Sequence, residues 1–147
     1  MQLVSRIAAA QATIDRFLDT EFQWGANDCA HLAAFVIRAL GHADPLAKID
    51  SYGTRRNALK AMKRAGIASF AEHLEKLGFE PIPPAMALPG DVVGIPAEAD
   101  DEAKGWVALG VAIGQDRVLG FANGRCSWAP THVCSHAWRV PPAGEAA

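Results

Sequence analysis

The sequence has no excess of charge of either sign: 14 lysine and arginine residues stand against 16 aspartate and glutamate residues, a formal net charge of −2. A dedicated nucleic-acid binder carries a clear basic excess, so this balance argues against nucleic acid as a partner. The sequence also lacks an apolar run of about 18 residues, the length that a membrane-spanning helix needs. We therefore expect neither a nucleic-acid interface nor a membrane span.

Cysteine is scarce, with Cys29, Cys126 and Cys134 far apart in the chain. An odd number at wide spacing argues against a disulfide framework, so each thiol is expected to be a core residue, a ligand or a nucleophile. The N-terminal segment also lacks the pattern of a secretory signal, because Arg6 and Arg16 interrupt its apolar residues. We expect a protein that is made in a cytoplasm.

Apolar residues are plentiful: they make up 50% of the 147 residues, while charged residues make up 20%. This supplies enough apolar surface to offset the entropy cost of ordering the chain, which excludes global disorder. The length fits a single domain over residues 1–147.

Helical spacing predominates over about 1–80, and short apolar runs of strand length predominate over about 90–140. We expect helices over residues 4–18, 30–40, 54–65 and 69–77. We expect strands over residues 91–95, 106–113, 117–121, 125–128 and 137–140. The proline-rich segment 79–89 is expected to be a surface linker. Helices followed by a small antiparallel sheet of about five strands predict an α+β fold.

Local signals mark the helix ends. Asn27 or Asp28 supplies an N-cap for the most apolar helix, and Gly41 supplies its C-terminal stop. In the first helix, Ile7 and Phe17 belong to a set of apolar residues at close to helical spacing.

Cys29 stands at the first turn of that apolar helix, after an aromatic-glycine pair, Trp24-Gly25. A helix N-terminus lowers the pKa of a thiol, and its free N–H groups can stabilise an anion, as in cysteine hydrolases. The alternative is that Cys29 packs as a small apolar side chain at a helix start.

Three sequence elements together resemble the NlpC-type cell-wall cysteine peptidases, over about residues 20–122. The elements are Trp24-Gly25 with Asp28-Cys29, Pro89-Gly90-Asp91-Val92-Val93, and Ala108-Leu109-Gly110-Val111-Ala112-Ile113-Gly114. The resemblance implies a papain-like α+β domain that cuts peptidoglycan stem peptides. It makes Cys29 the candidate nucleophile and places Trp24 and Asp28 in the substrate groove.

With the closing Ala137-Trp138-Arg139-Val140 included, the whole pattern resembles still more closely a family of small phage and prophage proteins encoded among tail genes. Against the peptidase motif, however, Ala108 stands where the catalytic histidine belongs, and the third polar residue falls near Gly120. Acyl transfer from a peptide needs a proton delivered to the leaving amine, which neither residue can provide. The resemblance therefore carries over a nucleophile, Cys29, without its base.

Other histidines could replace the missing base. His31 lies about 200° around the helix from Cys29 and is expected to face a groove or solvent. His132 and His136, in the C-terminal segment, could approach Cys29 and are the alternative bases.

The same segment offers a metal hypothesis, because Cys126, His132, Cys134 and His136 are all possible zinc ligands. In an extended strand, positions 132, 134 and 136 would share one face. The spacing matches no common zinc module and includes no C-x-x-C pair, so we expect no metal and no cofactor.

These observations lead to one functional hypothesis and a rival. The hypothesis is a structural or assembly protein of a phage tail tip or baseplate, located in the virion and built on an inactive NlpC-like domain. Its partners would be other tail proteins, hub and tail-tip components among them, with peptidoglycan as a further candidate. They would contact the N-terminal helix or the groove at Trp24. The rival is a working cysteine hydrolase that cleaves peptidoglycan stem peptides, with Cys29 as nucleophile and His132 or His136 as base.

Overall fold

Capping side chains fix where three of the helices begin. In the computed structural model, which describes residues 2–96 and 107–144, the helices are α1 (Gln2–Phe17), α2 (Cys29–Ala39), α3 (Arg55–Arg64) and α4 (Phe70–Lys76). Asp28, Thr54 and Ser69 each accept a hydrogen bond from a backbone N–H in the first turn of α2, α3 and α4 respectively. Each cap satisfies a donor that the helix itself cannot pair.

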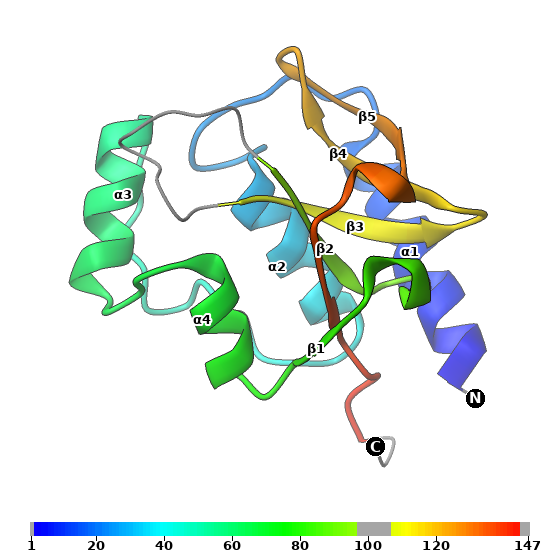
Figure 1. Ribbon diagram of the computed structural model, residues 1–147. Helices are drawn as coiled ribbons and strands as arrows, with labels where there is room; N and C mark the ends of the chain where they lie inside the picture. The colour runs from blue at the N-terminus through cyan, green and yellow to red at the C-terminus, as the bar shows by residue number, and fades with distance from the viewer. Residues whose placement is uncertain (1, 97–106, 145–147) are drawn as a thin grey trace.

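The second half of the chain forms an antiparallel sheet in the order β1-β6-β2-β3-β4-β5 (Figure 1). Its strands are β1 (Glu80–Ile82), β2 (Val92–Ile95), β3 (Ala108–Gly114), β4 (Arg117–Ala122), β5 (Arg125–Pro130) and β6 (His136–Arg139). Gln115 and Asp116 both have positive φ, the conformation that a tight hairpin turn between β3 and β4 requires. The α+β prediction is confirmed.

The described part of the sheet has six strands rather than about five, because the segment expected to be a linker contributes β1 and a short 3-10 helix, η1 (Pro84–Met86). β1 is an edge strand that pairs only with β6, and an edge tolerates Pro81 because one side of the strand needs no ladder hydrogen bonds. The expected start of the β3 strand, Trp106, lies outside the described residues.

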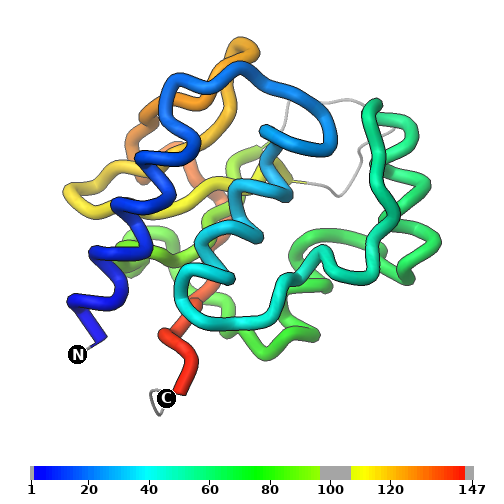
Figure 2. Tube along the Cα trace, turned by 180° about the vertical axis from the view of Figure 1, so that it is seen from behind, coloured from blue at the N-terminus to red at the C-terminus, as the bar shows by residue number. Residues whose placement is uncertain are grey.

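The core lies between the sheet and the first two helices. α1 and α2 cover the same face of the sheet, with α3 and α4 beside them (Figure 1; Figure 2). Leu32 and Val36 of α2 are fully buried in the same core cluster as Val111 of β3 and Trp138 of β6. The most apolar helix of the sequence is therefore the central one, as a helix of that composition requires. No helix in the described residues is long and apolar enough to cross a membrane.

The buried face of α1 includes Phe17, as its apolar spacing indicates, but at the start of the helix it is rotated by one residue. Ile7 is 53% exposed, whereas Arg6 is 1% exposed. The reason is Asp91, which is also buried and lies 3.0 Å from Arg6 in an ion pair. Arg139 Nε and the Val140 N–H donate to the same carboxylate, each at 2.9 Å. A buried charge is tolerated only with such partners, so Asp91 sets the rotation of α1.

Candidate functional site

Cys29 lies half-buried at the first residue of α2, beside an apolar cavity of about 280 Å³. The cavity lies between α2, α3, the 22–24 segment and the starts of β3 and the β4–β5 turn. Its apolar lining consists of Phe22, Trp24, Ala30, Ala58, Leu59, Met62, Phe70, Val107, Ala108 and Phe121. The structure thus brings together Trp24, Asp28, Cys29 and Ala108, four positions singled out in the sequence.

The surroundings of the thiol oppose its ionisation. Burial raises the pKa of Cys29 to about 11, and the nearby charge of Asp28 adds to the rise. The backbone hydrogen bond from Leu109 and those at the helix start favour the thiolate but do not outweigh burial. The helix start lowers this pKa as expected, but desolvation by burial outweighs it, so the net pKa is raised rather than lowered.

Asp28 collects hydrogen bonds from three parts of the chain. One oxygen, Oδ1, accepts from the His31 N–H at 2.9 Å and lies 2.7 Å from His31 Nδ1. The other, Oδ2, accepts from the Gly25 N–H at 2.9 Å and from the Tyr52 hydroxyl at 2.7 Å. Burial alone would raise the pKa of Asp28, but these hydrogen bonds outweigh it and hold the pKa below its ordinary value. Asp28 is therefore a buried carboxylate that stays ionised.

None of the histidines in the described residues lines the cavity beside Cys29. His132 is exposed on a short 3-10 helix, η3 (Thr131–Val133). His136 is exposed on β6, where Nδ1 pairs with Ser135 Oγ at 2.8 Å and the ring stacks on Trp138. The structure does not bring either proposed base into the cavity with the thiol.

The two positions that depart from the peptidase pattern differ in the room that each leaves for a larger side chain. Ala108, at the start of β3, lines the cavity with Cys29. Gly120 is buried in β4, where an added Cβ would lie 3.2 Å from Ile95 Cδ1. A side chain at position 120 would therefore require the end of Ile95 to shift.

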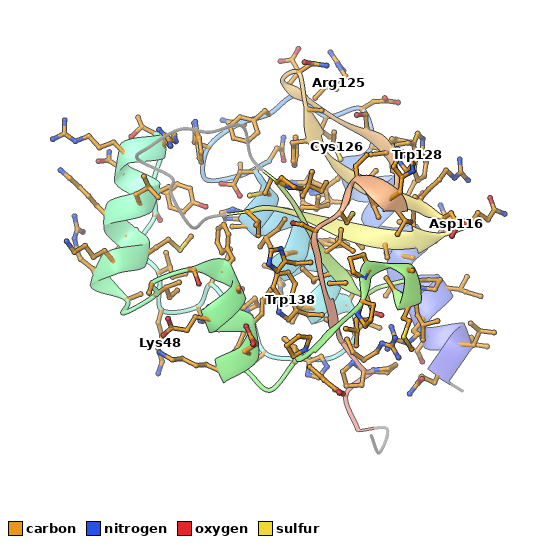
Figure 3. All side chains as sticks on the ribbon, in the orientation of Figure 1. Lys48, Asp116, Arg125, Cys126, Trp128 and Trp138 are labelled. Carbon is orange, nitrogen blue, oxygen red and sulfur yellow. The ribbon has the colours of Figure 1, made fainter. Side chains whose placement is uncertain are left out.

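The four possible zinc ligands of the C-terminal segment lie apart. Cys126, labelled in Figure 3, lies on β5 and is fully buried among the core side chains. Cys134 packs in a separate cluster with Val93 and Ala137. Residues 131–133 form η3 rather than a strand, so the expected shared face of positions 132, 134 and 136 does not form. Within the described residues, no group of three or more possible ligands could hold a metal ion.

Tyr52 belongs to the site and was not expected from the sequence. It lines the cavity beside Cys29, and its hydroxyl completes the set of donors around Asp28. Burial and the charge of Asp28 raise the pKa of Tyr52, so the hydroxyl keeps its proton and acts as a donor. It stands in the loop between α2 and α3, where no periodic pattern identifies it; the only signal is that it is the single tyrosine of the chain.

The sequence matches the model of the family described as "Domain of unknown function (DUF6950)" over residues 2–140. The chain belongs to this family. A search of the curated proteins finds no match. Among solved structures, the fold is similar to that of NlpC2 from Trichomonas vaginalis, with a TM-score of 0.56 and 15% identity. The match covers 93% of this chain and 47% of that one, so the chain of this DUF6950 member spans about half the length of NlpC2. At this identity the similarity establishes an NlpC-like, papain-like fold and nothing further.

Proposed function

We propose that this DUF6950 domain is a non-catalytic NlpC-fold module that serves as a structural or assembly component of a phage or prophage tail tip. The observation that carries the proposal is the composition of the cavity at Cys29. It holds a thiol, but none of the histidines among residues 2–96 and 107–144 lines it. The tail location rests on the sequence resemblance to small proteins encoded among tail genes.

The chemistry of that cavity is unfavourable for peptide hydrolysis. With a pKa of about 11, the Cys29 thiol is ionised in roughly one molecule in ten thousand at pH 7. Cleavage also needs an acid that protonates the leaving amine, and Ala108 occupies the place where the resemblance puts that group. The residues around the cavity therefore favour neither the attack by the Cys29 thiolate nor the departure of the amine.

The same cavity is suited to binding an apolar group. Its wall combines aromatic side chains, Phe22, Trp24 and Phe121, with aliphatic ones from α3. Phe22 stands edge-to-face against both Trp24 and Phe121, with ring centroids 4.8 and 5.5 Å away, which holds the aromatic wall in one arrangement. An apolar side chain of another tail protein would find a preformed recess there.

The decisive experiment incubates the purified protein with peptidoglycan and follows the release of stem-peptide fragments by mass spectrometry. We expect no release above that of a Cys29→Ala variant. Release that Cys29→Ala abolishes would overturn the proposal in favour of a working cysteine hydrolase, and the base would then have to be sought at His132 or His136.

A second measurement tests the tail location. Phage particles assembled with a tagged copy are purified, and the copy is quantified in virions. We expect it to be incorporated, and we expect Trp24→Ala to reduce incorporation while Trp128→Ala, an exposed tryptophan of β5 outside the cavity, does not. Absence of the unmodified chain from virions would contradict the structural role.

A further inference from the structure

A second cavity, of about 400 Å³, lies along a different side of α2 from the Cys29 cavity. Its floor is the helix stripe His31, Ala34, Phe35 and Arg38, residues spaced to share one face of an α-helix. Arg16, near the end of α1, and the 44–52 loop complete the wall. Figure 2 shows this loop leaving the end of α2 and leading toward α3. The size lies within the range of small-molecule and peptide sites.

The charged groups of this cavity leave a positive excess. Arg16 donates to the neutral side chain of Asn27 and stacks on Phe17, and no carboxylate among residues 2–96 and 107–144 forms an ion pair with it. Arg38 is exposed and forms no ion pair with any residue that the structure describes.

Two acidic side chains also line the cavity, both from its loop wall. Asp50 is paired with Arg64 at 3.2 Å, which offsets its charge. Asp44 accepts a hydrogen bond from the Leu46 N–H and remains as a negative charge. Two guanidinium groups against one uncompensated carboxylate leave one positive charge, which suits a ligand with one negative charge.

Apolar and polar surfaces lie side by side in this cavity. Phe35 of α2 faces it together with Leu46 and Ile49 of the loop. At the N-terminal end of the stripe, His31 Nδ1 is held by Asp28, and because a carboxylate can only accept, Nδ1 carries the proton in this pair. The other ring nitrogen, Nε2, is left to interact with a ligand group such as an amide N–H.

We propose that this cavity binds the carboxyl-terminal end of an apolar peptide. The terminal carboxylate is bound by the guanidinium group of Arg38, with Arg16, held at Asn27, adding positive charge at the other end of the stripe, and the apolar side chains lie against Phe35, Leu46 and Ile49. Guanidinium groups match the planar geometry of a carboxylate and strengthen its hydrogen bonds. The inference does not depend on the proposed tail function, because it concerns other residues and another cavity.

The test is isothermal titration calorimetry of the full chain with the peptide acetyl-Ala-Leu carrying a free carboxyl terminus. The same peptide with an amidated terminus is the matched probe, because it differs only in charge. Hexanoate is the third probe, because it has the carboxylate and an aliphatic body but no amide. We expect the free-carboxylate peptide to bind at least about tenfold more tightly than the amide, and more tightly than hexanoate. Its affinity should fall as salt is raised.

Variants then locate the site. Arg38→Gln should weaken binding of the free-carboxylate peptide about tenfold. Arg56→Gln, an equally charge-reducing change at an exposed arginine of α3 that lines neither cavity, should leave binding unchanged. Three outcomes would overturn the proposal: equal binding of peptide and amide, no binding of any probe at about 10 mM, or equal loss in the two variants. Binding of hexanoate as tight as that of the peptide would overturn the peptide as ligand.

Discussion

The Tyr52 hydroxyl donates a 2.7 Å hydrogen bond to Asp28 Oδ2, across 24 positions of sequence. Tyr52 lines both cavities, while Asp28 lines the one at Cys29 and holds His31, which lines the other. One buried carboxylate therefore connects the two recesses on either side of α2. Its oxygens hold Gly25, His31 and Tyr52, which line one or both of these cavities.

Asp28→Asn should destabilise the fold at neutral pH by roughly 1–3 kcal/mol, because Oδ1 and Oδ2 lose charge-assisted hydrogen bonds and α2 loses its best cap. The pKa of Asp28 is below its ordinary value, so its contribution is complete above about pH 4 and is lost as the pH falls through the folded-state pKa. Urea unfolding at pH 7, 5, 4 and 3 should show that the difference in the free energy of unfolding between the unmodified protein and the variant shrinks as the pH falls. A difference that stays constant with pH would show that the ionisation of Asp28 does not cause the loss of stability in the variant.

Asp91→Asn should destabilise the fold by about 3–5 kcal/mol, because it leaves the buried guanidinium of Arg6 without its counter-charge. The matched control is Asp50→Asn, which also breaks a pair with an arginine, Arg64. That pair has side chains about two-thirds exposed, so the loss should be within about 1 kcal/mol. Urea unfolding of both variants measures the difference. Similar losses of unfolding free energy in the two variants would mean that burial does not make the Asp91 ion pair more important for stability.

The parts of the fold that local chemistry decides were predictable from sequence. Asp28, Thr54 and Ser69 are capping residues next to apolar or amphipathic runs, and each begins a helix as expected. The β3–β4 hairpin likewise follows from the short connection between the expected strands 106–113 and 117–121. These features depend on residues within a few positions of one another, which is the range that a sequence pattern reports.

The parts that depend on distant partners were not predictable. Arg6 is buried because Asp91 lies beside it, and these residues are 85 positions apart. Tyr52 joins the site through a hydrogen bond to Asp28 from an irregular loop. The raised pKa of Cys29 reflects how deeply the completed fold desolvates it, which no local pattern contains.

Gly25→Ala should disrupt the site, because its φ is +84° and an added Cβ would lie 1.9 Å from the Tyr52 carbonyl oxygen. Both the backbone strain and the clash with a main-chain atom require the 22–28 turn to move, at a cost of about 2–4 kcal/mol. Gly53→Ala is the control, since nothing lies within 4 Å of its Cβ position and its φ is not positive; we expect a change within about 0.5 kcal/mol. Thermal unfolding of the two variants checks this, and equal stability would contradict the contact at Tyr52.

Alkylation of Cys29 by iodoacetamide should be slow at pH 7 and should rise about tenfold per pH unit up to about pH 10, because the reactive species is the thiolate. Peptide mapping by mass spectrometry separates Cys29 from Cys126, which is fully buried and has a pKa raised by burial to about 12, and from Cys134. N-acetylcysteine serves as the reference thiol. A rate at Cys29 that levels off below pH 8 would reveal an activated thiolate and support the hydrolase alternative.

Asp91 accepts hydrogen bonds from Arg6, near the start of the chain, and from Arg139 and Val140, near the end of the described residues. A ribosome makes these groups in order, so α1 emerges long before the carboxylate that sets its rotation. The Asp91 carboxylate in turn gains its last donors only when β6 and Val140 have been made. A nascent chain that stops before Arg139 therefore holds Asp91 without two of its donors. The contacts of Asp91 can be completed only after Val140 has been made, and products interrupted before that residue should be readily degraded by cellular proteases.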